Sequence, residues 1–236
     1  ARALQLTRRF GKDAFRNPAA EKQTAAEILY NDELKNSSGG ALLDKLRQTL
    51  IGRGFLVPTA EGNKSFINLD NAASTPTFTP VWNVVRQSWR QPEQIQQEIV
   101  HEVRSVCSGV LGAPLADYDI IFTSNTTEAI NLAAESLNHE SGQETEPVVL
   151  STILEHTSND LPWRMVHNVS IIRLSIDREG VIDLNELEKI LYEYNQKDHH
   201  GKRRIRIVAV SGASNVLGIC NNLPEISRIV HQHGAR

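Results

Sequence analysis

The feature that most constrains the fold is a short apolar run that stops at a polar turn. Ile120, Ile121 and Phe122 are residues of the kind that fill a buried strand, and a polar tetrad at residues 124–127 follows almost directly. Beyond the turn, apolar residues recur at i, i+3, i+4 and i+7, namely Ile130, Ala133, Ala134 and Leu137. The pattern predicts a strand, a turn and then an amphipathic helix.

The predicted helix begins with a capping signature. Asn125 and Glu128 have the spacing of a helix cap and its reciprocal acid. The first N–H groups of a helix have no partners inside it, and the helix dipole is positive at that end. Thr126 and Thr127 add hydroxyl groups, so the turn is a candidate seat for a phosphate. Taken alone, however, this stretch is better explained as an ordinary capped helix of an α/β protein.

Strands and helices alternate through the second half of the chain. The predicted strands cover residues 148–150, 169–174 and 205–210, and helices capped by Asp183 and Asn222 are predicted between and after them. The last strand is too apolar to have a solvated face, which is typical of a parallel sheet covered on both sides. Residues 211–215 follow it, at the edge where open α/β sheets bind ligands.

The first half of the chain is less regular. Four helices are predicted in it, over residues 25–34, 42–51, 80–89 and 95–110. We expect the second of these to pack, and residues 37–40 before it to be a flexible joint. A short strand at residues 66–69 runs into a turn of small and polar residues at 70–76, where backbone can approach a ligand closely.

Composition limits the classes of function. The chain of 236 residues is 40% hydrophobic, enough for a sizeable core, and its formal charge of -3 argues against a general binder of nucleic acid or of anionic membranes. There is no apolar run of membrane-spanning length and no signal sequence, so we expect a cytoplasmic protein. Cys107 and Cys220 are too few for a disulfide scaffold, and no metal site is predicted.

Four segments at predicted strand ends occur in the order typical of one enzyme family. They are residues 69–76 (LDNAASTP), 122–131 (FTSNTTEAIN), 155–159 (EHTSN) with 161–164 (LPWR), and 210–218 (VSGASNVLG). Together they resemble the class V aminotransferases, pyridoxal-phosphate enzymes whose nearest branch holds cysteine desulfurases and selenocysteine lyases. The resemblance covers residues 66–235. It implies the large domain of the type I fold, a mostly parallel sheet with helices on both faces.

The resemblance also implies which residues bind pyridoxal 5′-phosphate. Asn125, Thr126 and Thr127 would hold the cofactor phosphate, and His156 would act in catalysis by stacking on the pyridine ring. The residue types suit these roles, because helix N–H groups and hydroxyls suit a dianionic phosphate and a flat imidazole suits a ring face. Taken alone, His156 would be interpreted as a loop histidine satisfied by its neighbours.

Further residues would bind the substrate. By resemblance, Asn215 lies beside the phenolic oxygen of the cofactor and the substrate carboxylate, where an amide can hydrogen-bond without adding charge. Asn71, Ala72 and Ala73 would form a wall of the substrate pocket. The alternative interpretation of Asn215 is a turn-forming residue.

Departures from the family pattern bear on activity. The Schiff-base lysine of the family, and the aspartate that faces the pyridinium nitrogen, belong after residues 234–235, and every lysine of this chain precedes that point. The small C-terminal domain lies outside the sequence too, so we expect these residues alone to be inactive. At residues 89–92, where relatives carry a loop with glycine and serine, the chain passes almost directly between helices.

These observations predict a polar N-terminal arm and helix over residues 1–60 and part of a cofactor-binding large domain over 61–236. The arginines of the arm weakly suggest a transit peptide, which Asp13 opposes. The full-length protein would be a dimeric enzyme that cleaves a C–S or C–Se bond of an amino acid. An aminotransferase or epimerase is the alternative within the family. A non-catalytic binding module and a nucleotide or sugar-phosphate binder are alternatives outside it, the last weakened by the lack of glycine-rich motifs.

Overall fold

The structure, a computed structural model, describes residues 23–32, 34–140, 145–197 and 199–236. These residues form two compact units, divided between Ile121 and Phe122, and each unit is considered by itself. The expected N-terminal arm falls largely on residues 1–22, outside the described residues. The domain boundary expected at residue 60 remains a prediction.

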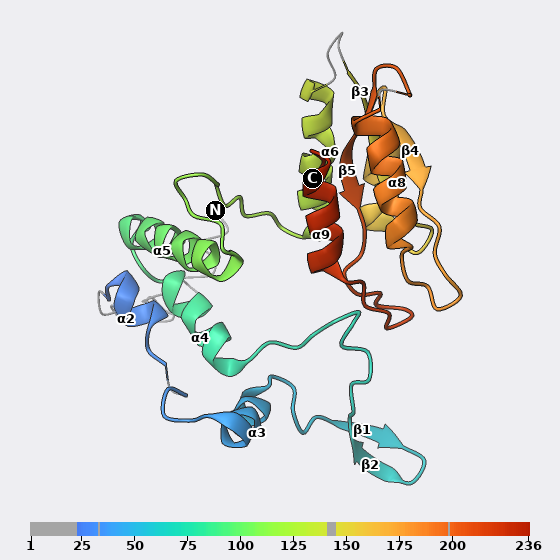
Figure 1. The fold of residues 1–236 in the computed structure, drawn as a ribbon. Helices are drawn as coiled ribbons and strands as arrows, with labels where there is room; N and C mark the ends of the chain where they lie inside the picture. Colours follow the sequence, from blue (N-terminus) through green and yellow to red (C-terminus); the bar gives the residue numbers. More distant parts are fainter. Residues whose placement is uncertain (1–22, 33, 141–144, 198) are drawn as a thin grey trace, which may run out of the picture. The chain divides into compact units, whose positions relative to one another are not determined.

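A three-stranded parallel sheet forms the centre of the second unit (Figure 1). Its strands are β3 (Glu146–Ser151), β4 (Ser170–Arg173) and β5 (Arg203–Ala209), in the order β4-β3-β5. The sequence predicted strands at all three places, and the prediction of a parallel sheet is confirmed. From Pro147 onward β3 is buried throughout, because it has a neighbour on each edge and a layer of helices on each face.

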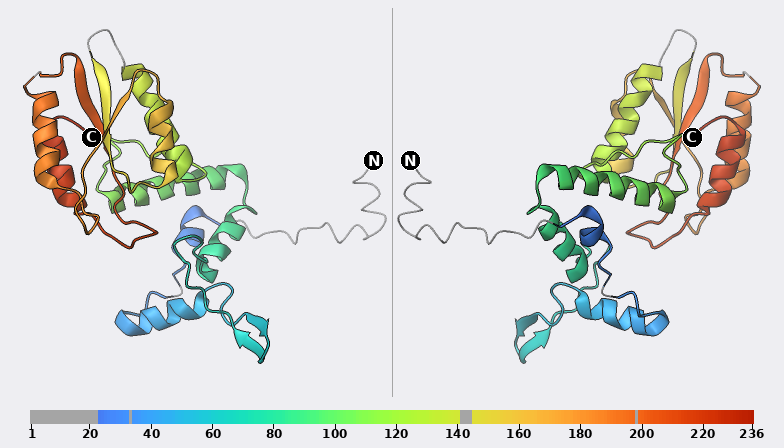
Figure 2. Two further views of the ribbon diagram at one scale, coloured as in Figure 1. Left: turned by 90° about the vertical axis from the view of Figure 1, so that its right-hand side faces the viewer. Right: turned by 90° about the vertical axis from the view of Figure 1, so that its left-hand side faces the viewer.

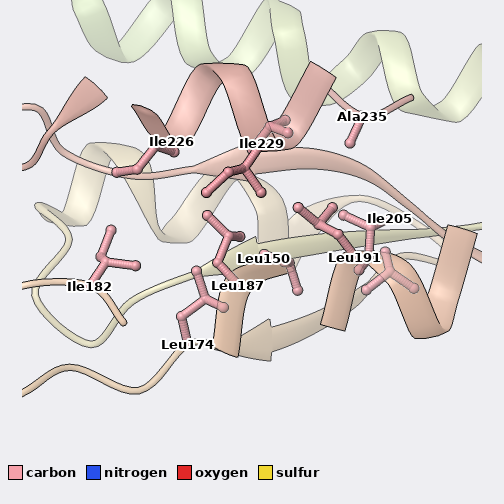
Figure 3. Close-up of a cluster of buried hydrophobic side chains, with 11 residues drawn as sticks. Leu150, Leu174, Ile182, Leu187, Leu191, Ile205, Ile226, Ile229 and Ala235 are labelled. Atoms are coloured by element: carbon pink, nitrogen blue, oxygen red, sulfur yellow. The ribbon is translucent and has the colours of Figure 1, made fainter. Parts of the chain in front are cut away.

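Helices cover both faces of this sheet (Figure 2). They are α6 (Thr126–Glu140), α7 (Leu161–Met165), α8 (Leu184–Asn195) and α9 (Leu223–Gln232). Side chains alternate along β3, so Val148 and Leu150 enter the core under α8 and α9 (Figure 3), whereas Val149 enters the core under α6 and α7. The two cores explain why this strand reads as a continuous apolar run.

A register shift in β5 keeps both faces of that strand apolar. Val148 pairs with Ile205, but Val149 pairs with Ile207, so β5 carries one extra residue at this point. As a result Ile205 and Val208 both pack in the core under α8 and α9, although they are three residues apart in sequence. Ile207 packs against the opposite core.

The other edge of β5 is hydrogen-bonded as well. The N–H of Arg236 donates to the carbonyl of Arg206 at 2.9 Å, and the carbonyl of Arg236 accepts the N–H of Val208 at 2.7 Å. These two bonds flank Ile207, which is how neighbouring parallel strands pair. Arg236 therefore pairs with β5 in the parallel direction, as β3 does on the other edge.

The first unit is mainly helical. Its core contains Ile28, Ile95 and Ile99, contributed by α2 (Ala25–Leu29) and α5 (Glu93–Leu111), with α4 (Thr79–Ser88) packed beside them. The helix α5 ends at Gly112, which has the left-handed conformation expected of a helix-ending glycine. Within the described residues, no helix has both the length and the apolar character needed to cross a membrane.

The helix α3 (Gly39–Thr49) differs from expectation in two ways. Gly39 and Gly40 begin the helix, with Ser38 as its N-cap, so the expected flexible joint at residues 37–40 is wrong. Gly39 has a φ of 54°, a conformation that favours glycine over other residues. The expected packing of this helix is also wrong, since none of its residues is buried. An apolar stripe packs only where the fold supplies a surface for it.

Two of the expected strands are absent. Residues 66–69 and 120–122 form no strand, and Leu69 and Ile121 are largely exposed. Apolar, β-branched residues favour an extended backbone, but a strand also needs a neighbour in ladder register. The first unit contains instead an antiparallel hairpin of β1 (Leu56–Thr59) and β2 (Gly62–Ser65), which the sequence analysis missed. Its residues are mostly exposed, so it lacks the alternation that marks a strand.

We expect Leu150→Ala to lower the free energy of unfolding by about 2–5 kcal/mol, because the change leaves a cavity in the central core. Leu150 is 0% exposed, whereas Leu132 on α6 is 45% exposed. The matched change Leu132→Ala should therefore cost less than about 1 kcal/mol. Urea unfolding followed by circular dichroism measures both, and equal losses would contradict the assignment of Leu150 to the core.

Candidate functional site

The start of α6 is closed by side chains. The Oδ1 atom of Asn125 accepts the N–H of Glu128 at 2.9 Å, which confirms the predicted cap. Oε2 of Glu128 accepts the N–H of Ser124 at 2.7 Å and its hydroxyl at 2.5 Å. The reciprocal bond is thus displaced by one residue from its predicted partner, because Ser124 offers two donors. The hydroxyl bond, and then the N–H bond, lower the pKa of Glu128 below its ordinary value.

This cap leaves the outer side of the turn accessible. Thr126 and Thr127 are the first residues of α6 and both are exposed. They place two hydroxyl groups beside the first N–H groups of a helix of 15 residues. Such a combination of neutral donors and a positive dipole end is suited to an anion.

Glu155 connects the ends of β3 and β5. Its Oε1 accepts the hydroxyl of Thr152 at 2.7 Å. Its Oε2 accepts the side-chain N–H of Asn159 at 2.8 Å and the hydroxyl of Ser211 at 2.7 Å. Thr152 and Asn159 belong to the segment after β3, whereas Ser211 follows β5. One carboxylate therefore joins two loops at the carboxyl edge of the sheet.

His156 is exposed and is the N-cap of the short helix η2 (Thr157–Asn159). Its Nδ1 accepts the N–H of Ser158 at 3.2 Å and lies 2.6 Å from the hydroxyl of the same residue. A ring nitrogen that accepts an N–H bond carries no proton, so the neutral form of His156 has its proton on Nε2. The imidazole is thus anchored through one nitrogen and is otherwise accessible.

Asn215 is exposed in the turn that follows β5. Ser214 shapes this turn: its N–H donates to the carbonyl of Ile219 at 2.8 Å, and its hydroxyl accepts the N–H of Leu217 at 3.1 Å. Gly218 completes the turn with a φ of 69°, a conformation that favours glycine. The turn accounts for the serine and the glycine on either side of Asn215, and it leaves the amide of Asn215 accessible.

The sheet brings three of the predicted binding elements to one edge. The start of α6, the His156 turn after β3 and the Asn215 turn after β5 all lie at the carboxyl ends of the parallel strands (Figure 1). This is the edge at which open α/β sheets bind ligands. The second unit therefore contains Asn125, Thr126 and Thr127 together with His156 and Asn215. Their roles in binding remain predictions.

The other predicted binding residues lie in the first unit. Asn71, Ala72 and Ala73 form a turn in which the carbonyl of Asp70 accepts the N–H of Ala73 at 3.3 Å. The Oδ1 of Asn71 accepts the side-chain N–H of Asn68 at 2.9 Å. The turn has the expected form, and its place in a substrate pocket with Asn215 remains a prediction.

The connection between α4 and α5 is short, as the sequence predicted. It consists of residues 89–92, and its Gln91 is 6% exposed. The carbonyl of Gln91 accepts the side-chain N–H of Gln96 at 2.9 Å, and its Oε1 accepts the N–H of Gln23 at 3.3 Å. The buried side chain of Gln91 is thus hydrogen-bonded, as most buried polar groups are.

An ion-pair network lies beside the His156 turn, and sequence analysis missed it. Asp160 bonds to Arg173 and, at 2.6 Å, to Nη2 of Arg164, while Nη1 of Arg173 donates to the carbonyl of Thr152 at 3.0 Å. Burial raises the pKa of Asp160, but the hydrogen bonds from Arg173 and then Arg164 outweigh it, and the pKa lies below its ordinary value. The available signal was Arg173, a charged residue at the end of the apolar strand β4.

We expect Asp160→Asn to lower the free energy of unfolding at pH 7 by about 1–3 kcal/mol, because charge-assisted hydrogen bonds are lost. A carboxyl group whose pKa is lowered by folding stabilises the folded state above its unfolded pKa and loses that effect as the pH falls. The difference from wild type should therefore shrink below about pH 4. Denaturant unfolding of both proteins at pH 7 and pH 3 measures this difference in the free energy of unfolding.

Asp44→Asn is the matched control for this change. Its carboxylate is 69% exposed and pairs with Arg47 at 3.4 Å on the surface of α3. We expect a change of less than about 0.5 kcal/mol at either pH. A difference between wild type and Asp160→Asn that is the same at pH 7 and pH 3 would contradict the charge argument.

Comparison with known proteins places this arrangement in context. A family model described as aminotransferase class-V matches residues 67–236. A probable cysteine desulfurase of Halalkalibacterium halodurans is 37% identical over 120 residues, covering 50% of this chain and 27% of that protein. One of Methanothermobacter thermautotrophicus is 30% identical over 185 residues, covering 73% of this chain and 42% of that protein. The chain spans less than half the length of these relatives.

Solved structures support the fold. The apo structure of a cysteine desulfurase from Thermococcus onnurineus matches with a TM-score of 0.61 and 26% identity, over 81% of this chain and 45% of that chain. The cysteine desulfurase CsdA from Escherichia coli matches with a TM-score of 0.59 and 21% identity, over 81% and 46%. The predicted fold, the α/β large domain of the type I pyridoxal-phosphate enzymes, is confirmed over the matched residues.

Proposed function

Since the chain belongs to the class V aminotransferase family, we propose that the protein binds pyridoxal 5′-phosphate and cleaves the C–S bond of an amino acid, as its relatives' name, cysteine desulfurase, implies. The observation that carries the proposal is the convergence of the start of α6, His156 and Asn215 at one edge of the sheet. The relatives' names favour sulfur over selenium. Assembly as a cytoplasmic homodimer is proposed from the family resemblance alone.

The residues at this edge fit the cofactor by their chemistry. Asn125, Thr126 and Thr127 offer a capped helix start with two exposed hydroxyls, which suits a phosphate. His156 is held through Nδ1 and is otherwise exposed, so its ring is available to stack on a pyridine. Asn215 presents a neutral amide, which can bond an oxyanion without creating a charged pair.

Each residue would have a limited task. When bound, pyridoxal phosphate supplies an electron sink for bond cleavage beside an amino group. Thr126 and Thr127 would hold the phosphate, and His156 would orient the ring while keeping the proton of its neutral form on Nε2. Asn215 would bind the substrate carboxylate, and Asn71, Ala72 and Ala73 would wall the substrate pocket. Every lysine of this sequence precedes the position at which the family places its Schiff-base lysine, so the first experiment measures cofactor binding.

We expect the chain to bind pyridoxamine 5′-phosphate, a probe with no aldehyde to react with surface lysines. His156→Ala should weaken binding about tenfold through lost stacking, and Thr126→Val with Thr127→Val should weaken it by a similar factor through lost hydrogen bonds. His231→Ala, which removes an exposed histidine of α9, is the matched control and should leave the affinity unchanged. Isothermal titration calorimetry measures all four proteins. Absence of binding by the wild-type chain would refute a cofactor site at this edge.

The reaction itself is tested with the natural protein loaded with pyridoxal phosphate and given L-cysteine. Sulfide release would establish cleavage of the C–S bond. Transfer of the amino group to the cofactor without sulfide would favour the aminotransferase alternative. Cofactor binding without any reaction of amino acids would favour a non-catalytic module.

A further inference from the structure

We propose that Glu155 is a positioning residue, whose carboxylate fixes the turn that carries His156 relative to the turn that carries Asn215. The inference rests on the proposed function, because it concerns the same edge of the sheet. Glu155 would act through the two loops that it joins, without contacting the cofactor. Its three hydrogen bonds, to residues on both loops, are the observation that leads to this assignment.

On the β3 side, Glu155 holds both ends of the His156 turn. Its neighbour in sequence is His156 itself, and Asn159 closes the turn by donating its N–H to the carbonyl of His156 at 2.8 Å. The side chain of Asn159 in turn donates to Glu155 at 2.8 Å. The indole N–H of Trp163, a residue only 4% exposed, donates to Asn159 at 3.3 Å and connects the turn to the core.

On the β5 side, Glu155 holds the base of the loop that carries Asn215. The hydroxyl of Ser211 donates to Glu155 at 2.7 Å. The chain returns at Asn221, whose side chain donates to the carbonyl of Ser211 at 2.8 Å and whose N–H donates to that of Gly212 at 2.9 Å. Asn215 therefore lies on a loop whose two ends are hydrogen-bonded to each other, and one of these ends is hydrogen-bonded to Glu155.

An apolar contact supports both loops at the same place. Gly180 is buried with a φ of 84°, and a Cβ atom there would lie 2.6 Å from Cδ1 of Ile219 and 3.2 Å from Cδ1 of Leu154. Leu154 precedes Glu155, and Ile219 follows the Asn215 turn. The two loops thus meet at one glycine, and Glu155 adds a polar connection between them.

A carboxylate suits the three donors that surround it at position 155. A carboxylate is an acceptor at both oxygens and can take all three bonds. The hydroxyls of Thr152 and Ser211 can reverse their direction, so a glutamine could accept from Asn159 and donate to a hydroxyl. Glutamine should therefore preserve the connection, aspartate should be one methylene too short to span all the donors, and alanine should remove the connection.

The test compares Glu155→Ala and Glu155→Gln with Glu186→Ala in the 236-residue chain. Glu186 lies on α8 and accepts the N–H of Ser175 at 2.9 Å and its hydroxyl at 3.1 Å. Ser175 follows β4 and belongs to neither turn. The readouts are backbone amide resonances without ligand, the Kd for pyridoxamine 5′-phosphate, and the melting temperature. If Glu155→Ala does not fold, Glu155→Asp takes its place with the same expected effects.

We expect Glu155→Ala to shift the amide resonances of residues 156–159 and 214–218 together and to weaken ligand binding at least tenfold. Glu155→Gln should stay within threefold of wild type, and Glu186→Ala should lose melting temperature without losing affinity. Unchanged resonances at 214–218, wild-type affinity of Glu155→Ala, or an equal loss of affinity in Glu186→Ala would overturn the inference. If the wild-type chain binds no ligand, the proposed function fails, and the amide resonances alone decide the role of Glu155.

Discussion

The parallel pairing of β3 with a strand on each edge is the constraint on which the second unit depends. It removes the backbone of β3 from solvent on both edges. The apolar side chains on both faces of the strand are then stable only where helices cover them. It also sends the chain out of β3 and β5 at the same edge. The His156 and Asn215 turns are neighbours for this reason, although they lie 59 positions apart in the sequence.

The edge where these strands end must be polar for two reasons at once. The loops that leave the buried strands are held by hydrogen bonds between polar side chains, those of Glu155, Asn159 and Ser211. A phosphorylated ligand needs accessible donors, which the start of α6 supplies. The two needs are met by different side chains. Those that hold the loops are half-buried and bonded to each other, whereas His156 and Asn215 are exposed.

The sequence was informative where a residue's neighbours along the chain determine its structure. The strands β3 and β5 and the caps at Asn125, Asp183 and Asn222 were predicted because burial and capping leave local patterns. Residues 66–69 and 120–122 carry a strand pattern without forming strands, because pairing depends on distant segments. The same limit hid Glu155: its motif was recognised, but its bond to Ser211 spans 56 positions in sequence.

The division into two units separates two aspects of the proposed site. The side chains suited to the cofactor lie in the second unit and are organised by its sheet, whereas Asn71, Ala72 and Ala73 lie in the first unit and are organised by their own turn. Affinity for the cofactor should therefore respond to changes in the side chains at the carboxyl edge of the sheet. It should be insensitive to changes in the turn at residues 71–73. A mutation at Asn71 that altered cofactor affinity as strongly as one at His156 would contradict this separation.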